Sequence, residues 1–289
     1  MSDLIKIPEG ITIKDYCRQR LLNYIRLKGY SNENTYKSYR TNLETVLRRF
    51  PDPSKANLLQ VQNFASEFKN DYTRKNICVI LRWLFNKVYN YNIEWHQLPY
   101  PKKKKKIQPI YRKEDILKVL NAIRNPKQKA ILALIIDCGL RVSEPCSILL
   151  SDCNSKERSI IIRGAKGDND RFAYPSESVW DLIRAYWSAT NQKPEKYLFE
   201  GWPKDKPYSE ESIRQFLRRY CNEVGVKYLG VHAIRRFTGT WWAENGVPHT
   251  VASQKLGHQS VKTYERHYLI HSPTYLKNVA SPLAEAKHG

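Results

Sequence analysis

Hydrophobic residues recur at helical spacing through the first part of the chain. In residues 31–50 they stand three or four positions apart, and residues 73–90 carry a second stripe with the same period. Side chains at this spacing share one face of an α-helix. The pattern predicts a small, amphipathic, four-helix domain between Ile11 and about Tyr91. The two stripes comprise Tyr36, Tyr39, Leu43, Val46, Leu47 and Phe50, and Ile77, Ile80, Leu81, Leu84, Phe85 and Val88.

The second part of the chain mixes helical patterns with two short strands. Residues 113–125 predict a helix, and residues 127–140 are apolar nearly all round, which is typical of a helix buried at the centre of a domain. Residues 158–165 and 171–175 predict strands joined by a turn. Helices are also predicted at 176–190, at 209–225 and, two or three in number, within 231–268. The predicted fold class is therefore mainly α with a small β-sheet (α+β).

The strongest boundary signal lies between these parts, where three prolines bracket five consecutive lysines. Such a run repels itself and does not pack. It predicts a strap across phosphates, although a nuclear address or a plain solvated linker would have the same composition. The predicted organisation is a flexible arm (1–10), a helical domain (11–98), a Pro/Lys-rich linker (99–110) and a second domain with a C-terminal tail (111–289). The lysines are Lys102, Lys103, Lys104, Lys105 and Lys106.

Charge narrows the choice of partner. The chain of 289 residues has a formal net charge of +21, and Lys plus Arg outnumber Asp plus Glu both before and after residue 109. Two basic halves suggest a polyanion held from two sides, and nucleic acid fits best; a lysine-rich protein without a particular partner is the alternative. Arg74, Lys75, Arg82 and Lys87 lie off the second stripe and predict a basic outer face. That face would either bind DNA or be an ordinary solvated surface.

Several features are missing from the sequence. No apolar run reaches the roughly 18 residues of a membrane span, and the N-terminus lacks the apolar core of a secretory signal. The six cysteines form no Cys-x-x-Cys pair and no cluster with zinc spacing, so we expect no structural metal. These observations predict a soluble, cytoplasmic, DNA-associated protein whose cysteines are reduced and mostly buried.

The chemistry-bearing residues concentrate between Val231 and Tyr268. This stretch holds a His-x-x-Arg pair (His232, Arg235), a Leu-Gly-His triplet ending at His258, and Tyr268 ten residues later. Guanidinium and imidazole groups donate hydrogen bonds to a phosphodiester, and a phenol is a nucleophile that attacks phosphorus. The set predicts phosphate chemistry without a metal.

Five motifs in order resemble the tyrosine recombinases, the phage-type integrases. They are GLRVSEPCSILL (139–150), IIIRGAKGDNDRFAYP (160–175), HAIRR, LGHQS and ERHY. The resemblance covers residues 110–270 in detail and the N-terminal domain only in size, helicity and charge. It implies a helical core-binding domain and a catalytic domain that form a C-shaped clamp on double-stranded DNA. It also implies strand cleavage through a 3′-phosphotyrosyl intermediate without any cofactor, by a homotetramer acting through a Holliday junction.

The resemblance also implies a role for each matched residue. Arg141 and Arg235 correspond to the arginines that clamp the scissile phosphate, and Lys166 to the hairpin lysine that protonates the leaving 5′-oxygen. His232 and His258 correspond to the two histidines that donate to the phosphate oxygens, and His232 could also accept the proton of the nucleophile. Without the resemblance, Arg141 would be interpreted as a cap on helix carbonyls and Lys166 as a solvent-exposed turn residue.

Three further assignments follow. Glu144 matches the acidic residue that orients the phosphate donors without reacting. Tyr268 is the expected nucleophile, while Tyr264, one helical turn earlier, is expected to pack. Arg236 stands where many members have a histidine and adds to the expected DNA-binding residues, with Arg74, Lys75 and the lysine run.

The motifs leave the biological reaction open. The ERHY ending resembles phage-type members and favours integration or excision of a mobile element, with accessory DNA-bending or directionality proteins. The alternatives are a Xer-like dimer resolvase, strand passage of the type IB topoisomerase kind, and a non-catalytic DNA-binding protein. A tail with Leu276, Val279 and Leu283 would dock either on a neighbouring protomer or on its own chain.

Overall fold

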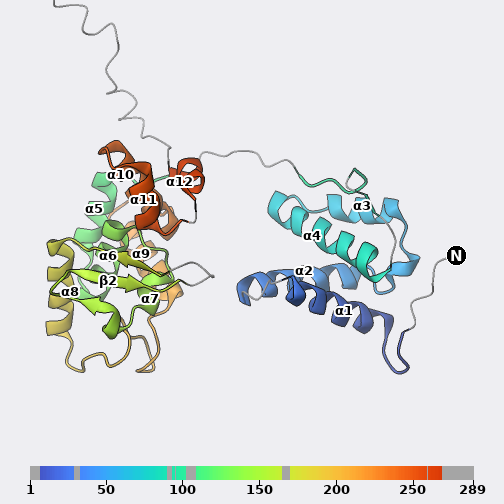
Figure 1. Ribbon diagram of the computed structural model, residues 1–289, viewed down its shortest axis with the longest axis horizontal. Helices are drawn as coiled ribbons and strands as arrows, with labels where there is room; N and C mark the ends of the chain where they lie inside the picture. The colour runs from blue at the N-terminus through green and yellow to red at the C-terminus, as the bar shows by residue number, and fades with distance from the viewer. Residues whose placement is uncertain are drawn as a thin grey trace, which may run out of the picture. The chain divides into compact units, whose positions relative to one another are not determined.

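The chain forms two compact units, Met1–Lys106 and Ile107–Gly289, here called the N-terminal and C-terminal units (Figure 1). The division falls inside the range expected to be a linker. The computed structural model describes residues 7–28, 33–89, 93–94, 96–101, 109–164, 170–258 and 260–268, with only the backbone for 33, 34 and 266–268. Most of the expected arm, the lysine run, Lys166 and the tail lie outside the described residues.

The described part of the N-terminal unit consists of helices joined by loops and turns. The hydrophobic stripes predicted from the sequence face one another, and Leu21, Leu43, Leu47, Ile77 and Leu81 are completely buried between the helices. The predicted helices are therefore confirmed, although the second stripe ends in a short π-helical turn. The elements are α1 (Ile13–Leu27), α2 (Glu33–Arg49), η1 (Pro53–Lys55), α3 (Leu58–Ser66), α4 (Asp71–Trp83) and η2 (Leu84–Val88).

The basic side chains of α4 do not all lie on an open surface. Arg82 is only 8% exposed, donates a hydrogen bond to the carbonyl of Leu98, and lies over the ring of Tyr100. Its expected place on a basic outer face is therefore wrong. Arg74 is half-buried and donates from Nε to the carbonyl of Phe68 at 2.8 Å. Long basic side chains can cover apolar surface and cap carbonyls as readily as they face solvent.

The C-terminal unit is built around helix α6 (Pro126–Cys138), which is buried as its all-round apolar sequence predicts. Asn125 caps the first turn of α6. Gly139 ends the helix with a left-handed φ of +62°, which residues with a side chain rarely adopt. Helices α5, α7, α8 and α10 pack against it (Figure 1). The other helical elements are α5 (Lys113–Ala122), α7 (Glu144–Ser147), η3 (Leu150–Asp152), α8 (Glu177–Ala189), α9 (Glu210–Glu223), α10 (Val231–Glu244), α11 (His249–Leu256) and α12 (Val261–Tyr268).

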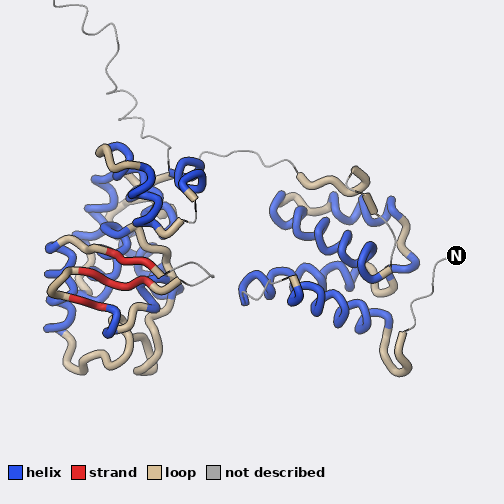
Figure 2. The backbone as a smooth tube through the Cα atoms, in the orientation of Figure 1, coloured by secondary structure: helices blue, strands red, loops and turns tan. Residues whose placement is uncertain are grey.

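A three-stranded antiparallel sheet completes this unit and is drawn in red in Figure 2. Its strands β1 (Cys153–Asn154), β2 (Ser159–Ile162) and β3 (Arg171–Ala173) pair in sequence order, with Ile160 opposite Ala173. The sequence predicted β2 and β3 but missed β1, because two residues are too short to show a period. The turn between β2 and β3 is closed by Asp170, whose carboxylate accepts the amide of Gly164 at 3.0 Å.

In the described part of the chain, no helix has the length and apolarity needed to cross a membrane, and no cluster of His, Cys, Asp or Glu is arranged to hold a metal ion. All six cysteines are free thiols, and five of them are buried, as expected. Burial raises the pKa of each thiol, for example that of Cys146 to about 12.

The core around α6 yields a stability prediction. Leu134 is completely buried there, whereas Leu117 on the neighbouring helix α5 is 41% exposed. Leu134→Ala should lower the free energy of unfolding by about 2–5 kcal/mol because it leaves a cavity, and Leu117→Ala by less than about 1 kcal/mol. Chemical denaturation of both variants checks this, and equal losses at the two positions would contradict the predicted core.

Candidate active site

Helix α10 carries the first pair of site residues. His232 and Arg235 are three positions apart, so both project from one face of the helix. The hydroxyl of Thr238 donates to the carbonyl of Ile136 at 2.6 Å and fixes α10 on α6. Arg235 is 2% exposed; its Nη1 donates to the carbonyl of Gly139 at 2.7 Å and its Nη2 to the carbonyl of Leu256. One guanidinium therefore binds the C-terminal ends of both α6 and α11.

The second site segment is the turn after α11. Gly257 ends the helix with φ +67°, which turns the chain so that His258 faces α10. The ring Nε2 of His258 lies 3.2 Å from Nη2 of Arg235. Because a guanidinium only donates hydrogen bonds, a hydrogen bond at this contact requires Nε2 of His258 to be the acceptor. Arg235 thus orients His258.

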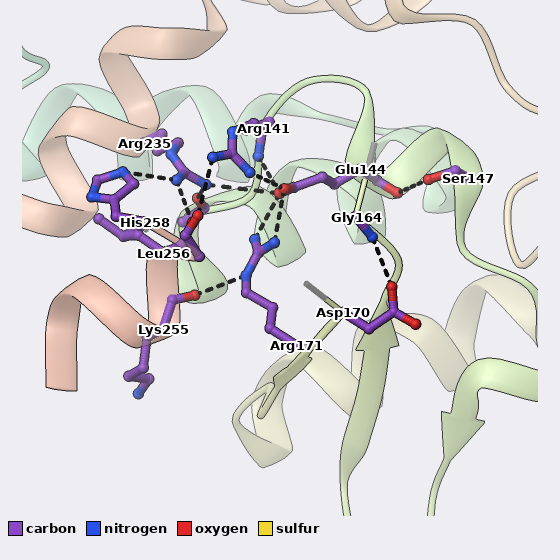
Figure 3. A network of polar contacts seen from close by, with 12 residues as sticks. Arg141, Glu144, Ser147, Gly164, Asp170, Arg171, Arg235, Lys255, Leu256 and His258 are labelled. Carbon is purple, nitrogen blue, oxygen red and sulfur yellow. Dashed lines mark hydrogen bonds and ion pairs between the residues drawn. The ribbon is translucent and has the colours of Figure 1, made fainter. Parts of the chain in front are cut away.

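Glu144 joins these elements to the start of α7 (Figure 3). Its side chain is 4% exposed, and its carboxylate accepts the backbone amide of Arg141 at 2.6 Å and the Arg141 Nη1 at 2.8 Å. Nη1 of Arg235 lies 3.7 Å away. Arg141 also donates to the carbonyl of Gly257 at 3.2 Å, yet 31% of its side chain remains exposed. The Arg141 guanidinium is thus both held in place and accessible to a ligand.

A third arginine, Arg171, belongs to the same network but was missed by the sequence analysis. It is the first residue of β3, and its guanidinium faces both oxygens of Glu144 at 2.8 Å (Figure 3). A signal for it exists in the sequence. Side chains alternate along a strand, so Arg171 shares the face of buried Ala173, while Phe172 and Tyr174 are exposed. A charged residue on the inward face of a strand needs a buried partner.

The three arginines keep Glu144 ionised. Burial alone would raise the pKa of this carboxyl, but hydrogen bonds and charge from Arg171, together with the charge of Arg235 and the amide of Arg141, outweigh burial and lower the pKa. A buried carboxylate that remains charged is a fixed negative anchor for the guanidiniums.

His232 lies at the edge of this network, on the same side of α10 as Arg235, and is itself exposed. Desolvation by the packed surroundings, and then the positive charges of Arg235, Arg236 and Arg141, lower the pKa of its imidazole. The ring is therefore kept in its neutral form, which can accept a proton at neutral pH. Arg236, the next basic residue of α10, donates to the carbonyl of Pro109 at 3.0 Å.

Helix α12 carries both tyrosines considered as nucleophiles. Tyr264 is completely buried, and its hydroxyl donates to the carbonyl of Gly239 at 2.7 Å. It is a packing residue. Tyr268 is the last residue of α12, one turn further along, and its side chain lies outside the described residues, as does all of Lys166. The described site therefore unites Arg141, Glu144, Arg235 and His258, with His232 beside them.

Comparison with known proteins identifies the architecture. The model of the phage integrase family matches residues 110–274, which is more than half of the chain. The chain belongs to the phage integrase family, the tyrosine recombinases. It is therefore a site-specific DNA recombinase, an enzyme that transfers DNA strands. The family motifs span α6 to α12, the same elements that build the site.

Individual relatives agree with this assignment. The tyrosine recombinase XerA of Pyrococcus horikoshii is 26% identical over 274 residues, covering 93% of each chain. A lambda integrase dimer bound to a COC′ core site superimposes with a TM-score of 0.71 at 13% identity, covering 89% of this chain and 77% of the other. The Tn1549 transposon integrase in complex with circular intermediate DNA gives 0.69 at 17% identity, with 93% and 98% covered. The likeness to these solved structures shows the fold of this recombinase.

The buried carboxylate of the recombinase yields the second prediction. Glu144→Gln removes the negative charge among three guanidiniums and should lower the free energy of unfolding at neutral pH by about 3 kcal/mol. Because the pKa of Glu144 is lowered on folding, its contribution is complete above its ordinary pKa of 4.5 and is lost as the pH falls through the lower folded value. Denaturation curves at pH 7 and across the acid range measure both effects.

The variant should therefore lose less stability than the unchanged protein on acidification below about pH 4.5. Glu157→Gln, at an exposed turn position, is the matched control and should change neither quantity. Parallel acid curves for Glu144→Gln and the unchanged protein would contradict the buried ion pair.

Proposed function

We propose that this recombinase cleaves and rejoins DNA through Tyr268 in order to integrate or excise a mobile element. The observation that carries the chemical part is the network of Arg141, Arg235 and His258 around Glu144. It gathers hydrogen-bond donors and positive charge in one place. A phosphodiester gains a second negative charge as a nucleophile adds, and fixed guanidiniums stabilise that charge.

The proposed reaction conserves the energy of the phosphodiester. The Tyr268 hydroxyl loses its proton to His232 and attacks the phosphorus, which forms the 3′-phosphotyrosyl bond. Lys166 donates a proton to the departing 5′-oxygen, so the leaving group is a hydroxyl and not an alkoxide. A 5′-hydroxyl from a partner strand then attacks the phosphotyrosyl phosphorus, rejoins the DNA and frees Tyr268.

In this proposal the two basic units close on the duplex as a clamp, and four protomers act on two duplexes through a Holliday junction. Phosphate contacts from the lysine run Lys102–Lys106, Arg74, Lys75 and Arg236 would position the DNA and carry no sequence information. The charge on both sides of residue 109 supports a grip from two sides. The solved relatives with lambda core-site and transposon DNA support the DNA partner.

A second candidate function is Xer-like resolution of chromosome dimers. It is favoured by the relation to tyrosine recombinase XerA, which extends over 93% of both chains. Mobile-element recombination is favoured by the ERHY ending, Glu265 to Tyr268, and by the fold shared with the transposon integrase.

The location of the cleavage site distinguishes these functions. The protein is incubated with fragmented DNA of its source organism, covalent adducts are captured under denaturing conditions, and the attached DNA is sequenced. Junctions of an element that carries the gene support the mobile-element role. A single chromosomal site far from the gene supports resolution, and relaxation of supercoiled DNA of any sequence would point to strand passage of the topoisomerase kind.

The nucleophile gives a prediction that compares two tyrosines of one helix. On nicked DNA that traps cleavage, Tyr268→Phe should abolish the covalent adduct, because phenylalanine has no oxygen to attack phosphorus. Tyr264→Phe should retain the adduct and lose only about 1 kcal/mol of stability, the worth of its bond to Gly239. A denaturing gel with peptide mass spectrometry reads the result. An adduct that survives in Tyr268→Phe refutes the assignment.

The lowered pKa of His232 predicts the pH profile of cleavage. If the neutral ring accepts the phenol proton, the rate falls at low pH with a midpoint below the ordinary histidine value of 6.5. Arg236→Gln removes a neighbouring positive charge and should move that midpoint upward, whereas Arg236→Lys keeps the charge and should leave it in place. Single-turnover rates at saturating protein from pH 5 to 8 measure it. A midpoint at or above 6.5 in the unchanged protein would rule out this role.

A further inference from the structure

All three guanidinium nitrogens of Arg171 donate hydrogen bonds to other groups of the protein. Nη1 and Nη2 each lie 2.8 Å from a different oxygen of Glu144, and Nε donates to the carbonyl of Lys255 at 3.1 Å. Only 11% of the Arg171 side chain and 4% of the Glu144 side chain are exposed. A buried, bidentate guanidinium–carboxylate pair of this kind is rigid and strongly oriented. Arg171 thus differs from Arg141, which remains accessible to a ligand.

The charges of the network explain what Arg171 contributes. Three guanidiniums, those of Arg141, Arg171 and Arg235, surround the single carboxylate of Glu144. The bidentate pair with Arg171 neutralises that carboxylate and leaves the two positive charges of Arg141 and Arg235. Two positive charges match the two negative charges that a phosphodiester carries when a nucleophile adds to it. Without Arg171, the negative charge of Glu144 would be neutralised by Arg141 and Arg235 instead. These are the groups expected to hold the phosphate.

Arg171 also touches the turn that presents His258. Its Nε donates to the carbonyl of Lys255 in the last turn of α11 (Figure 3). Its side chain also lies against Gly257. A methyl group placed on Gly257 would come within 2.8 Å of Cδ of Arg171. The carbonyl of Gly257 in turn accepts a hydrogen bond from Arg141. A single side chain from β3 therefore fixes both the carboxylate and the backbone beside His258.

We propose that Arg171 is a positioning residue of the recombinase: it neutralises Glu144 and braces the Gly257–His258 turn, so that Arg141 and Arg235 keep their full charge for the phosphate. The inference rests on the proposed function, because it assumes that the network binds the scissile phosphate. Arg171 acts through other residues and does not touch the DNA.

The test compares two substrates that differ in charge at the scissile phosphate. One is the nicked trapping DNA, and the other carries a methylphosphonate there, in which a methyl group replaces one charged oxygen. Adding a nucleophile to the neutral group creates only one negative charge. Single-turnover cleavage rates at saturating protein are measured for the unchanged protein, Arg171→Met and Arg171→Lys, together with DNA affinity.

On the phosphodiester, Arg171→Met should cleave about 100-fold more slowly, as is typical when a supporting contact of a site is lost, with DNA affinity changed less than about threefold. On the methylphosphonate the deficit should shrink to less than about tenfold, because less positive charge is required. Arg171→Lys keeps the charge but not the paired geometry. Its cleavage rate on the phosphodiester should therefore lie between the rates of the unchanged protein and of Arg171→Met. If Arg171→Met folds poorly, the Arg171→Lys comparison on the two substrates remains decisive.

The control is Arg184→Met. Arg184 pairs with Glu177 and Asp181 on the surface of α8, and its variant should cleave both substrates at the unchanged rate. An equal deficit of the Arg171 variants on both substrates would indicate a purely structural role and overturn the inference, as would no deficit at all. Failure of the proposed function would show differently, as the absence of any adduct on Tyr268 in the unchanged protein.

Discussion

The site depends on one buried negative charge. The carboxylate of Glu144 lies where α7, α10, β3 and the turn after α11 converge, and each of its oxygens accepts more than one hydrogen bond. Three guanidiniums would repel one another if they were brought together without it. The carboxylate allows them to be concentrated in a small volume before a phosphate arrives. The positive charge of the network is thus preorganised, and under the proposed function little rearrangement would be required when DNA binds.

The backbone uses the same cations for a second purpose. Helices α6 and α11 end in the site, and their last carbonyl groups have no partner within the helix. Arg235 binds the carbonyls of Gly139 and Leu256, Arg141 that of Gly257, and Arg171 that of Lys255. Arg141 can therefore cap a helix and bind a phosphate at the same time. An arginine with several donors can hold a carbonyl with one edge and present the other to a ligand.

Much of the fold could be predicted because the signals are local. The apolar run of α6, the stop at Gly139 and the stripes of α2 and α4 depend on spacing within a few residues. The burial of Arg82 and the role of Arg171 could not be predicted in this way. Arg171 pairs with Glu144, 27 positions earlier, and a helical period places Arg82 off the apolar stripe without revealing the carbonyl of Leu98 that covers it. Contacts of this kind are decided by tertiary packing. The motif residues were predicted from the resemblance to a known family, because the motifs of a family already reflect its tertiary structure.

The distribution of the site along the chain bears on the order in which it forms during synthesis. Gly139 and Arg141 leave the ribosome well before Arg235, and α12, which ends at Tyr268, follows all of them. Arg235 joins α6 to α11 only after both helices exist. The arginine network is consequently assembled late, and the proposed nucleophile is the last of the site residues to be made. A nascent chain therefore carries the whole basic N-terminal unit before the arginine network of the C-terminal unit can be completed.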